Sequence, residues 1–116
     1  MKRRPARRIG RETEAEKVHK MLVREMRVCA VAKYAFAGRC RGGFDVAHLG
    51  PSGGTGRQHG DWTMSTLMCH SHHMQMDGHE RPSVFDGMSA DDLRAFKEFE
   101  IHLAREFVAG RRVSSL

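Results

Sequence analysis

No stretch of this sequence is long and apolar enough to cross a membrane. A spanning helix needs about eighteen or more consecutive apolar residues, whereas charged residues make up 29% of the 116-residue chain and leave only short apolar runs. We also expect no export signal, because the basic N-terminus is followed by Glu12, Glu14 and Glu16 and not by an apolar core. We therefore expect a soluble protein that acts in the cytoplasm.

Cysteine is scarce as well. The chain has three cysteines, Cys29, Cys40 and Cys69. An odd number in a chain without an export signal argues against a disulfide framework. Metal ligation and plain burial of small thiols are the roles that remain.

Three further absences limit the number of domains and the kinds of functional site that the chain can have. A chain of 116 residues leaves no room for a second independent core, and no internal repeat is visible. The glycine-rich segment 50–60 lacks the Gly-Lys-Ser/Thr ending of a phosphate-binding P-loop, so it is predicted to be a flexible loop. Asparagine does not occur at all.

Positive charge is present in excess, and it is concentrated at one end. The first six basic residues precede any acid: Lys2, Arg3, Arg4, Arg7, Arg8 and Arg11. The other fourteen basic residues equal the fourteen acidic ones, so the net charge of +6 resides in this segment. We predict that residues 1–12 form a basic arm, disordered when alone, whose arginines contact nucleic-acid phosphates. A solubilising tail is the alternative.

Two amphipathic helices are predicted to form the scaffold. Thr13 and Glu16 have the spacing of a capping box, and apolar residues at helical spacing follow over 14–27. Ser89 can cap a second helix with Asp92 at its third position. The predicted apolar face of that helix consists of Leu93, Phe96, Phe99, Leu103 and Phe107. Gly110 is expected to end it, leaving 111–116 as a tail.

The segment between these two predicted helices contains the candidate functional residues. Glycines and basic residues over 29–43 predict a turn or knuckle, and the patterns over 44–49 and 62–68 predict two short strands around the glycine-rich loop. A short helix over 69–77 follows, which Gly78 can end. The sequence thus predicts an α+β fold over 13–110, with a strand-loop-strand-helix core at about 43–78.

Histidines cluster at that short helix. Four of the eight histidines, His70, His72, His73 and His79, fall within ten residues together with Cys69 and Asp77. Residues three or four apart share a face of a helix. Cys69 and His72 can therefore meet one ion while His73 and Asp77 turn toward another.

The first ion would be a structural zinc. Cys29, Cys40, Cys69 and His72 together make the three-cysteine, one-histidine set that suits tetrahedral Zn²⁺. Cys29 and Cys40 do not have the tight Cys-x-x-Cys spacing, and three buried thiols are the alternative.

The second ion would be a divalent cation that takes part in chemistry. His73 and Asp77 offer nitrogen and oxygen ligands, and water or phosphate would fill the other positions. An exposed face of charged residues and histidine without a metal is the alternative.

Two segments resemble the HNH (ββα-metal) endonucleases, in particular small phage and prophage members. These segments are Ala47-His48-Leu49 and Met68-Cys69-His70-Ser71-His72-His73. The likeness extends over roughly 29–107. It implies a ββα-metal core with a zinc knuckle, flanked by an N-terminal and a C-terminal helix. It also implies a DNA endonuclease from a phage or mobile element in a bacterial host cell.

Position by position, the resemblance makes His48 the general base that activates water and His73 a ligand of Mg²⁺ or Mn²⁺. Asp77 stands where relatives often have another histidine. An ordinary imidazole, with a pKa near 6.5, can take a proton from water at neutral pH. The phosphodiester bonds of DNA would be the substrate.

The sequence departs from the HNH pattern at two positions. No asparagine is present to hold the ring of the base histidine, so Asp61, or else Thr63, Ser65 or a backbone carbonyl, would take that role. Ala47 replaces an expected ligand, and Asp45 is the nearest acid. On a regular strand Asp45 points to the face opposite His48, so we expect it to reach the metal only through a bulge or bend.

His79 is a further candidate ligand, although it follows His73 by six residues, beyond same-face spacing. Arg57 and His59 in the loop, and Arg39 and Arg41 beside the knuckle, are candidate phosphate contacts, or else solvated surface residues. Two other functions stay open: a catalytically inactive zinc module that binds nucleic acid, and a small metal-buffering or interaction protein.

Overall fold

The computed structural model describes residues 12–50 and 62–114. In this part of the chain it has three helices and one two-stranded antiparallel sheet, so the α+β class predicted from the sequence is confirmed. The elements follow one another as α1 (Glu14–Arg24), β1 (Phe44–His48), β2 (Ser65–Cys69), α2 (His70–Met76) and α3 (Ala90–Ser114). Most of the predicted basic arm and glycine-rich loop lies outside the described residues. Within the described ranges, no helix has the length and apolar character needed to cross a membrane.

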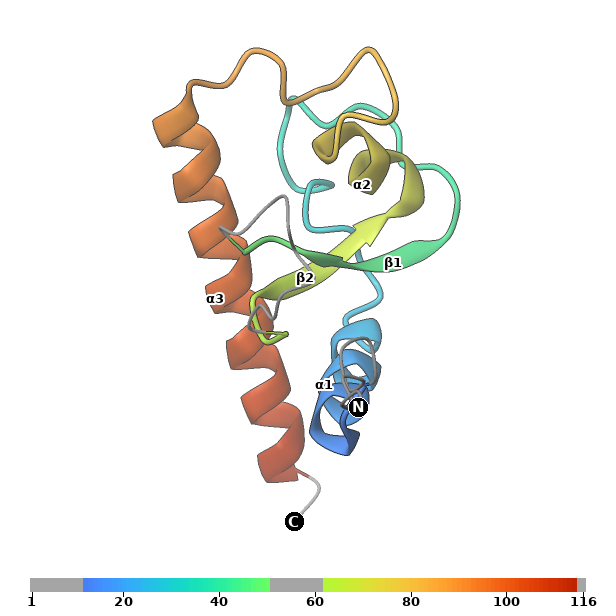
Figure 1. Cartoon of the computed structure of the whole chain (residues 1–116), viewed down its shortest axis with the longest axis vertical. Helices are drawn as coiled ribbons and strands as arrows, with labels where there is room; N and C mark the ends of the chain where they lie inside the picture. The colour runs from blue at the N-terminus through green and yellow to red at the C-terminus, as the bar shows by residue number, and fades with distance from the viewer. Residues whose placement is uncertain (1–11, 51–61, 115–116) are drawn as a thin grey trace, which may run out of the picture.

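The sheet forms the centre of the molecule, and β2 runs directly into α2 (Figure 1). Its strands pair one to one, from Phe44 opposite Cys69 to His48 opposite Ser65. Side chains alternate between the two faces of a sheet. Asp45 and Ala47 therefore share one face, and His48 lies on the other.

Side chains at the helix starts satisfy backbone donors as the sequence predicts. The Thr13 hydroxyl accepts a hydrogen bond from the Glu16 N–H at 3.1 Å, and the Ser89 hydroxyl accepts one from the Asp92 N–H at 3.0 Å. α2 begins after Cys69 and ends before Gly78, whose φ of 82° favours glycine. Local spacing was sufficient to predict these three caps.

Helix α3 differs from its prediction in length and in its buried face. It continues through Gly110 to Ser114, and Arg111 beyond the glycine donates to Glu25, the residue that follows α1, at 2.9 Å. Glycine inside a helix costs only about 1 kcal/mol relative to alanine, so tertiary contacts of this kind can offset it. The small Ala104 is fully buried, whereas Phe99 is 50% exposed.

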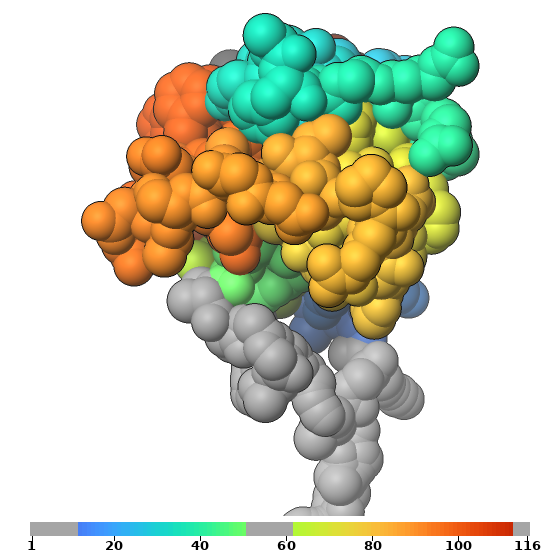
Figure 2. All heavy atoms as spheres, turned by 90° about the horizontal axis from the view of Figure 1, so that it is seen from above, coloured from blue at the N-terminus to red at the C-terminus, as the bar shows by residue number. Residues whose placement is uncertain are grey.

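The hydrophobic core lies on both faces of the sheet. A larger cluster includes Met68, Phe85 and Phe96, and a smaller one joins Leu67 of β2 to α1 and α3. Phe85 belongs to the segment between α2 and α3, which crosses one end of the molecule (Figure 2). Its ring lies 5.7 Å from that of Phe96, so the segment closes the larger cluster.

One buried acid connects α3 to the segment after α1. Glu100 is 2% exposed, and its carboxylate accepts hydrogen bonds from the Lys33 ammonium at 2.7 Å and the Tyr34 hydroxyl at 2.6 Å. A buried charge is tolerated only when it is paired and hydrogen-bonded. These two residues therefore hold the segment that follows Cys29 against α3.

Because Tyr34 is the only tyrosine in the chain, its absorbance titration reports on this contact alone. Burial, and then the hydrogen bond to Glu100, raise the pKa of Tyr34 from 10.0 to about 12. The folded state favours the neutral phenol of Tyr34. This preference therefore stabilises the fold fully below about pH 10, and the stabilisation is lost as the pH rises through about 12. Glu100→Gln should lower the titration midpoint toward the ordinary value. An unchanged midpoint would show that the carboxylate does not set this pKa.

Candidate metal centre and the adjacent histidine cluster

Three sulfur atoms and one imidazole nitrogen converge in the interior. The Sγ atoms of Cys29, Cys40 and Cys69 lie 3.5, 3.8 and 3.2 Å from His72 Nδ1, and all four donor atoms lie within 4.8 Å of one another. Donors about 2.0–2.3 Å from a tetrahedral ion lie roughly 3.5–3.8 Å apart. This Cys₃His cluster, the set proposed from the sequence, can hold a metal ion such as zinc.

The His72 ring is oriented as a metal ligand requires. Its Nε2 donates to the carbonyl oxygen of Ala37 at 2.7 Å, and the residue is fully buried. With the proton on Nε2, the Nδ1 lone pair points toward the three sulfurs. Metal-ligating histidines are generally fixed in this way by a partner of the second nitrogen.

Backbone contacts bring the distant cysteines to α2. Cys69 caps the helix, its Sγ accepting from the His72 N–H at 3.3 Å, so these two ligands come from one turn. The N–H groups of His70 and Ser71 donate to the carbonyls of Gly43 and Arg41 at 2.9 and 3.0 Å, holding the segment after Cys40. Next to Cys29, the Ala30 N–H donates to β2. Tertiary contacts thus replace the usual tight cysteine hairpin.

The surroundings of Cys40 disfavour a thiolate unless a cation is present. Burial, and then the neighbouring Cys29 and Cys69, raise the pKa of the Cys40 thiol to about 12. Although the residue as a whole is exposed, its sulfur faces the buried His72 ring. A bound metal reverses this preference because its charge stabilises thiolates. The Cys40 sulfur would therefore be a thiolate only with a cation bound.

A second group of side chains, the Asp45 cluster, joins β1 to the exposed face of α2. It consists of Asp45, His70, His73 and Asp77. Oδ2 of Asp45 lies 2.7 Å from His70 Nδ1 and 2.8 Å from His73 Nδ1. His73 Nε2 lies 3.3 Å from Asp77 Oδ2, one helical turn away. The predicted pairing of His73 with Asp77 is therefore present.

Asp45 lies on the face opposite His48, as expected, and this is the face that α2 covers. The sequence led us to expect that this residue would need a bulge or bend to reach His73, but the strand pairing is regular and Asp45 contacts the His73 ring directly. The sequence predicted that His48 lies beside the metal-binding helix, whereas α2 contacts the face that bears Asp45. Burial acts to raise the pKa of Asp45, but the hydrogen bonds from His73 and His70 outweigh it and lower the pKa.

His70 was not among the residues proposed from the sequence. It precedes His73 by three positions, so the spacing that grouped His73 with Asp77 places it on the same side of α2. That signal was available, but the partner shared by the two histidines, Asp45, became visible only in the fold.

The proposed base His48 lies at the far end of β1 from α2. Its side chain is exposed, and its Nδ1 accepts a hydrogen bond from the Gly50 N–H at 3.3 Å. Among the contacts of residues 12–50 and 62–114, none joins it directly to the Asp45 cluster. The His48 ring is thus not in direct contact with the His73–Asp77 pair.

The other proposed site residues are placed as follows. His79 is exposed, and its backbone N–H donates to the Met74 carbonyl at 2.8 Å; among the described residues no contact joins its side chain to the Asp45 cluster. Arg41 pairs with Glu80 at 3.0 Å, and Arg39 is exposed. The remaining proposed residues, Asp61, Arg57, His59, Arg3, Arg4, Arg7 and Arg8, lie outside the described part of the chain.

A substitution at Gly50 should displace the His48 ring without unfolding the protein. A Cβ at Gly50 would lie 2.6 Å from His48 Cε1 and 3.2 Å from its Nε2. The exposed ring can rotate away, so we expect Gly50→Ala to change stability by less than about 0.5 kcal/mol. Any activity that depends on His48 should fall. The measurements are urea unfolding and plasmid cleavage.

Gly87→Ala is the matched control, because a Cβ there would meet no heavy atom within 4 Å. Equal cleavage by wild type, Gly50→Ala and Gly87→Ala would show that the observed orientation of His48 is irrelevant to activity. A large loss of stability in Gly50→Ala alone would show that the ring cannot move aside.

Comparison of this chain with protein-family models, with curated proteins and with solved structures finds no match. Any functional conclusion therefore depends on the residues and their arrangement.

Proposed function

We propose that this protein is a metal-dependent DNA endonuclease of the HNH type. The observation that carries the proposal is the Asp45 cluster, located on the helix of a strand-strand-helix unit whose first turn also supplies two residues of the Cys₃His cluster. The short helix α2 thus contributes residues both to the Cys₃His cluster and to the Asp45 cluster. The net charge of +6 suits a polyanionic substrate.

His73 and Asp77 would hold Mg²⁺ or Mn²⁺, and zinc would occupy the Cys₃His cluster. The nitrogen and oxygen donors of the first pair suit a divalent cation with open positions. Asp45 contacts Nδ1 of His73, while Nε2 faces Asp77. This carboxylate therefore orients the His73 ring, as outer partners of ligating histidines do. The cation, when bound, neutralises charge on the scissile phosphate and on the leaving oxygen.

His48 would take the proton from the attacking water. The Gly50 N–H donates to its Nδ1, so in this conformation the lone pair is on Nδ1 and the proton on Nε2. Nδ1 would therefore take the proton of the attacking water in exchange for its hydrogen bond from the Gly50 N–H. The exposure of the ring leaves it accessible to a bound substrate.

A zinc-stabilised module that binds DNA without cutting it is the second candidate. The observation in its favour is that His48 and Asp45 lie on opposite faces of the sheet. This module would use the same fold and charge, so only a cleavage assay separates it from the nuclease.

The testing experiment is incubation of zinc-loaded protein with supercoiled plasmid in the presence and absence of added Mg²⁺ or Mn²⁺. We expect wild type to cleave only with the added cation, and Asp77→Asn to need a higher cation concentration because one anionic ligand is lost. Loss of a single outer partner costs about 10- to 100-fold in metal affinity, and the loss of a direct ligand should be at least as large.

Asp91→Asn provides the matched control, since Asp91 is an acid at the exposed start of α3 that pairs only with Arg94 among the described residues. It should leave the cation dependence unchanged. If wild type shifts DNA in a gel but never nicks it under any of these conditions, the inactive module is the correct function.

A further inference from the structure

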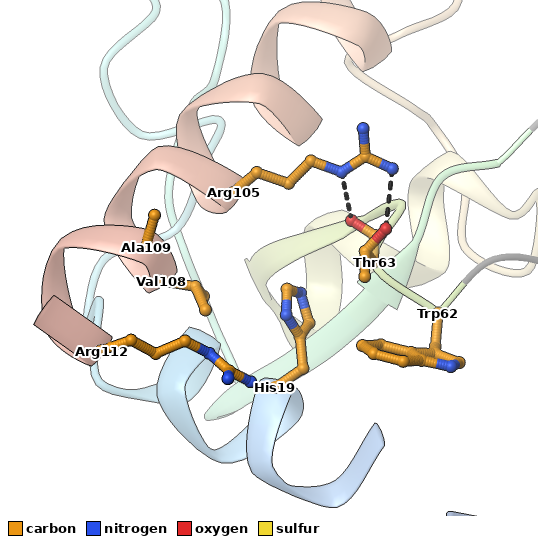
Figure 3. Close-up of a pocket in the computed structure, with 7 residues that line it drawn as sticks. All are labelled: His19, Trp62, Thr63, Arg105, Val108, Ala109 and Arg112. Carbon is orange, nitrogen blue, oxygen red and sulfur yellow. Dashed lines mark hydrogen bonds between the residues drawn. The ribbon is translucent and has the colours of Figure 1, made fainter. Parts of the chain in front are cut away.

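A pocket between α1, α3 and the residues before β2 combines an aromatic ring with positive charge (Figure 3). Its walls are formed by Trp62 and Thr63, by His19 of α1, and by Arg105, Val108 and Arg112 of α3. None of these residues belongs to the Cys₃His cluster or to the Asp45 cluster.

Two contacts hold Trp62 at this position. Arg105 donates from Nε to the Thr63 carbonyl at 3.2 Å and from Nη2 to the Thr63 hydroxyl at 2.7 Å, which fixes the neighbouring residue against α3. The buried His19 ring meets the indole edge to face, with 5.4 Å between ring centroids. The indole itself is only partly buried, so it is fixed in place and still accessible.

Arg112 supplies positive charge that no acidic residue of the described ranges neutralises. It is exposed near the end of α3 and has no carboxylate at ion-pair distance among the residues that the structure describes. Its neighbour Arg111, in contrast, pairs with Glu25. Arg105 is occupied by Thr63, so Arg112 is the cation best able to meet an anion.

We propose that this pocket binds an unpaired nucleotide of a DNA strand, with the base stacked on Trp62 and a phosphate at Arg112. Aromatic rings beside basic side chains are the means by which proteins hold single strands without regard to sequence. The apolar surface of Val108 suits a base, and the guanidinium suits a phosphate.

The position of the pocket favours a strand over a free nucleotide. Trp62 adjoins β2, because its carbonyl accepts a hydrogen bond from the Ser65 hydroxyl at 3.1 Å, and Ser65 pairs with His48 across the sheet. His48 lies on the sheet face that α1 and α3 cover, where the pocket also lies. A strand held in the pocket would pass near the proposed base, an inference that rests on the proposed function.

Because Trp62 is the only tryptophan in the chain, its fluorescence reports directly on this pocket. Zinc-loaded wild type, without added Mg²⁺ or Mn²⁺, is titrated with a short single-stranded oligonucleotide, a duplex of the same length, and deoxyadenosine monophosphate. We expect the single strand to change the emission at the lowest concentration. Equally tight binding of the mononucleotide would overturn the assignment to a strand.

Variants test the two proposed contacts through the anisotropy of a labelled oligonucleotide. Trp62→Leu should weaken single-strand binding by about 5- to 150-fold, the loss in affinity that corresponds to removing the stacking of one base. Trp62→Phe should restore part of it. Arg112→Ala should weaken binding more than Arg94→Ala, which also removes one exposed charge from α3. Because Arg112 is exposed, this variant is not expected to unfold the protein.

Equal effects of Arg112→Ala and Arg94→Ala, or single-strand binding without any change in Trp62 emission, would overturn the proposal. The proposal for the pocket and the proposal that the protein is a nuclease can be refuted separately. If the emission responds but the protein never cleaves DNA, the pocket stands and the nuclease does not. If DNA is cleaved while Trp62 remains insensitive to single strands, the nuclease stands and the pocket does not.

Discussion

His48→Ala is expected to slow plasmid cleavage by about a hundred- to ten-thousandfold, the usual contribution of a positioned general base. The imidazole is exposed, and its Nδ1 is the nitrogen without a proton, which accepts a hydrogen bond from the Gly50 N–H. Alanine removes that nitrogen without changing the core. DNA binding, measured by gel shift, should therefore stay near the wild-type value, and so should the thermal unfolding midpoint.

The control for this variant is His102→Ala, which removes another exposed histidine, from α3. It should cleave at the wild-type rate. Equal rates for His48→Ala and His102→Ala would show that His48 is not the base, even if the protein is a nuclease. A loss of DNA binding in His48→Ala equal to its loss of cleavage would assign the residue to binding.

Disruption of the Cys₃His cluster should have the largest effect on stability. Structural zinc contributes about 10–16 kcal/mol in small zinc-finger peptides, whereas a whole domain is stable by about 5–15 kcal/mol. The sheet has only two strands, and the chain before β1 is held to α2 partly through Cys29 and Cys40. We expect Cys40→Ser and His72→Ala to lose the metal and the cooperative thermal transition.

The measurements are metal content per chain and thermal unfolding, before and after removal of the metal by a chelator. His70→Ala is the matched control for His72→Ala, because His70 lies on the same helix but contacts Asp45 and not the sulfurs. It should keep one zinc per chain. Zinc that survives Cys40→Ser would exclude Cys40 as a ligand, and metal-free wild type with an unchanged transition would exclude a structural role.

The two proposed metal sites should respond separately to substitution. The Cys₃His cluster contacts the core through Cys29 and Cys69, whereas Asp77 is exposed. Variants of the first cluster should therefore lose structure and activity together. Asp77→Asn should change cation dependence in a protein that still unfolds cooperatively.

Short-range spacing in the sequence determined much of the local structure. The Cys69-x-x-His72 pair, the cap at Thr13 and the end of α2 at Gly78 each depend on residues within one helical turn. Such interactions form wherever the chain becomes helical, so the sequence alone predicts them. The proposed meeting of Cys29 and Cys40 with that helix was inferred from donor chemistry, and the fold brings them together.

Only the tertiary structure decided which face of each element is covered. Asp45 meets His70 and His73 because α2 lies over its side of β1, and beyond Gly110 the helix α3 is tied through Arg111 to Glu25 at the end of α1. The Trp62 pocket likewise joins three segments far apart in the sequence. Periodicity shows which residues share a face, but the partner of that face depends on how elements distant in the chain pack together.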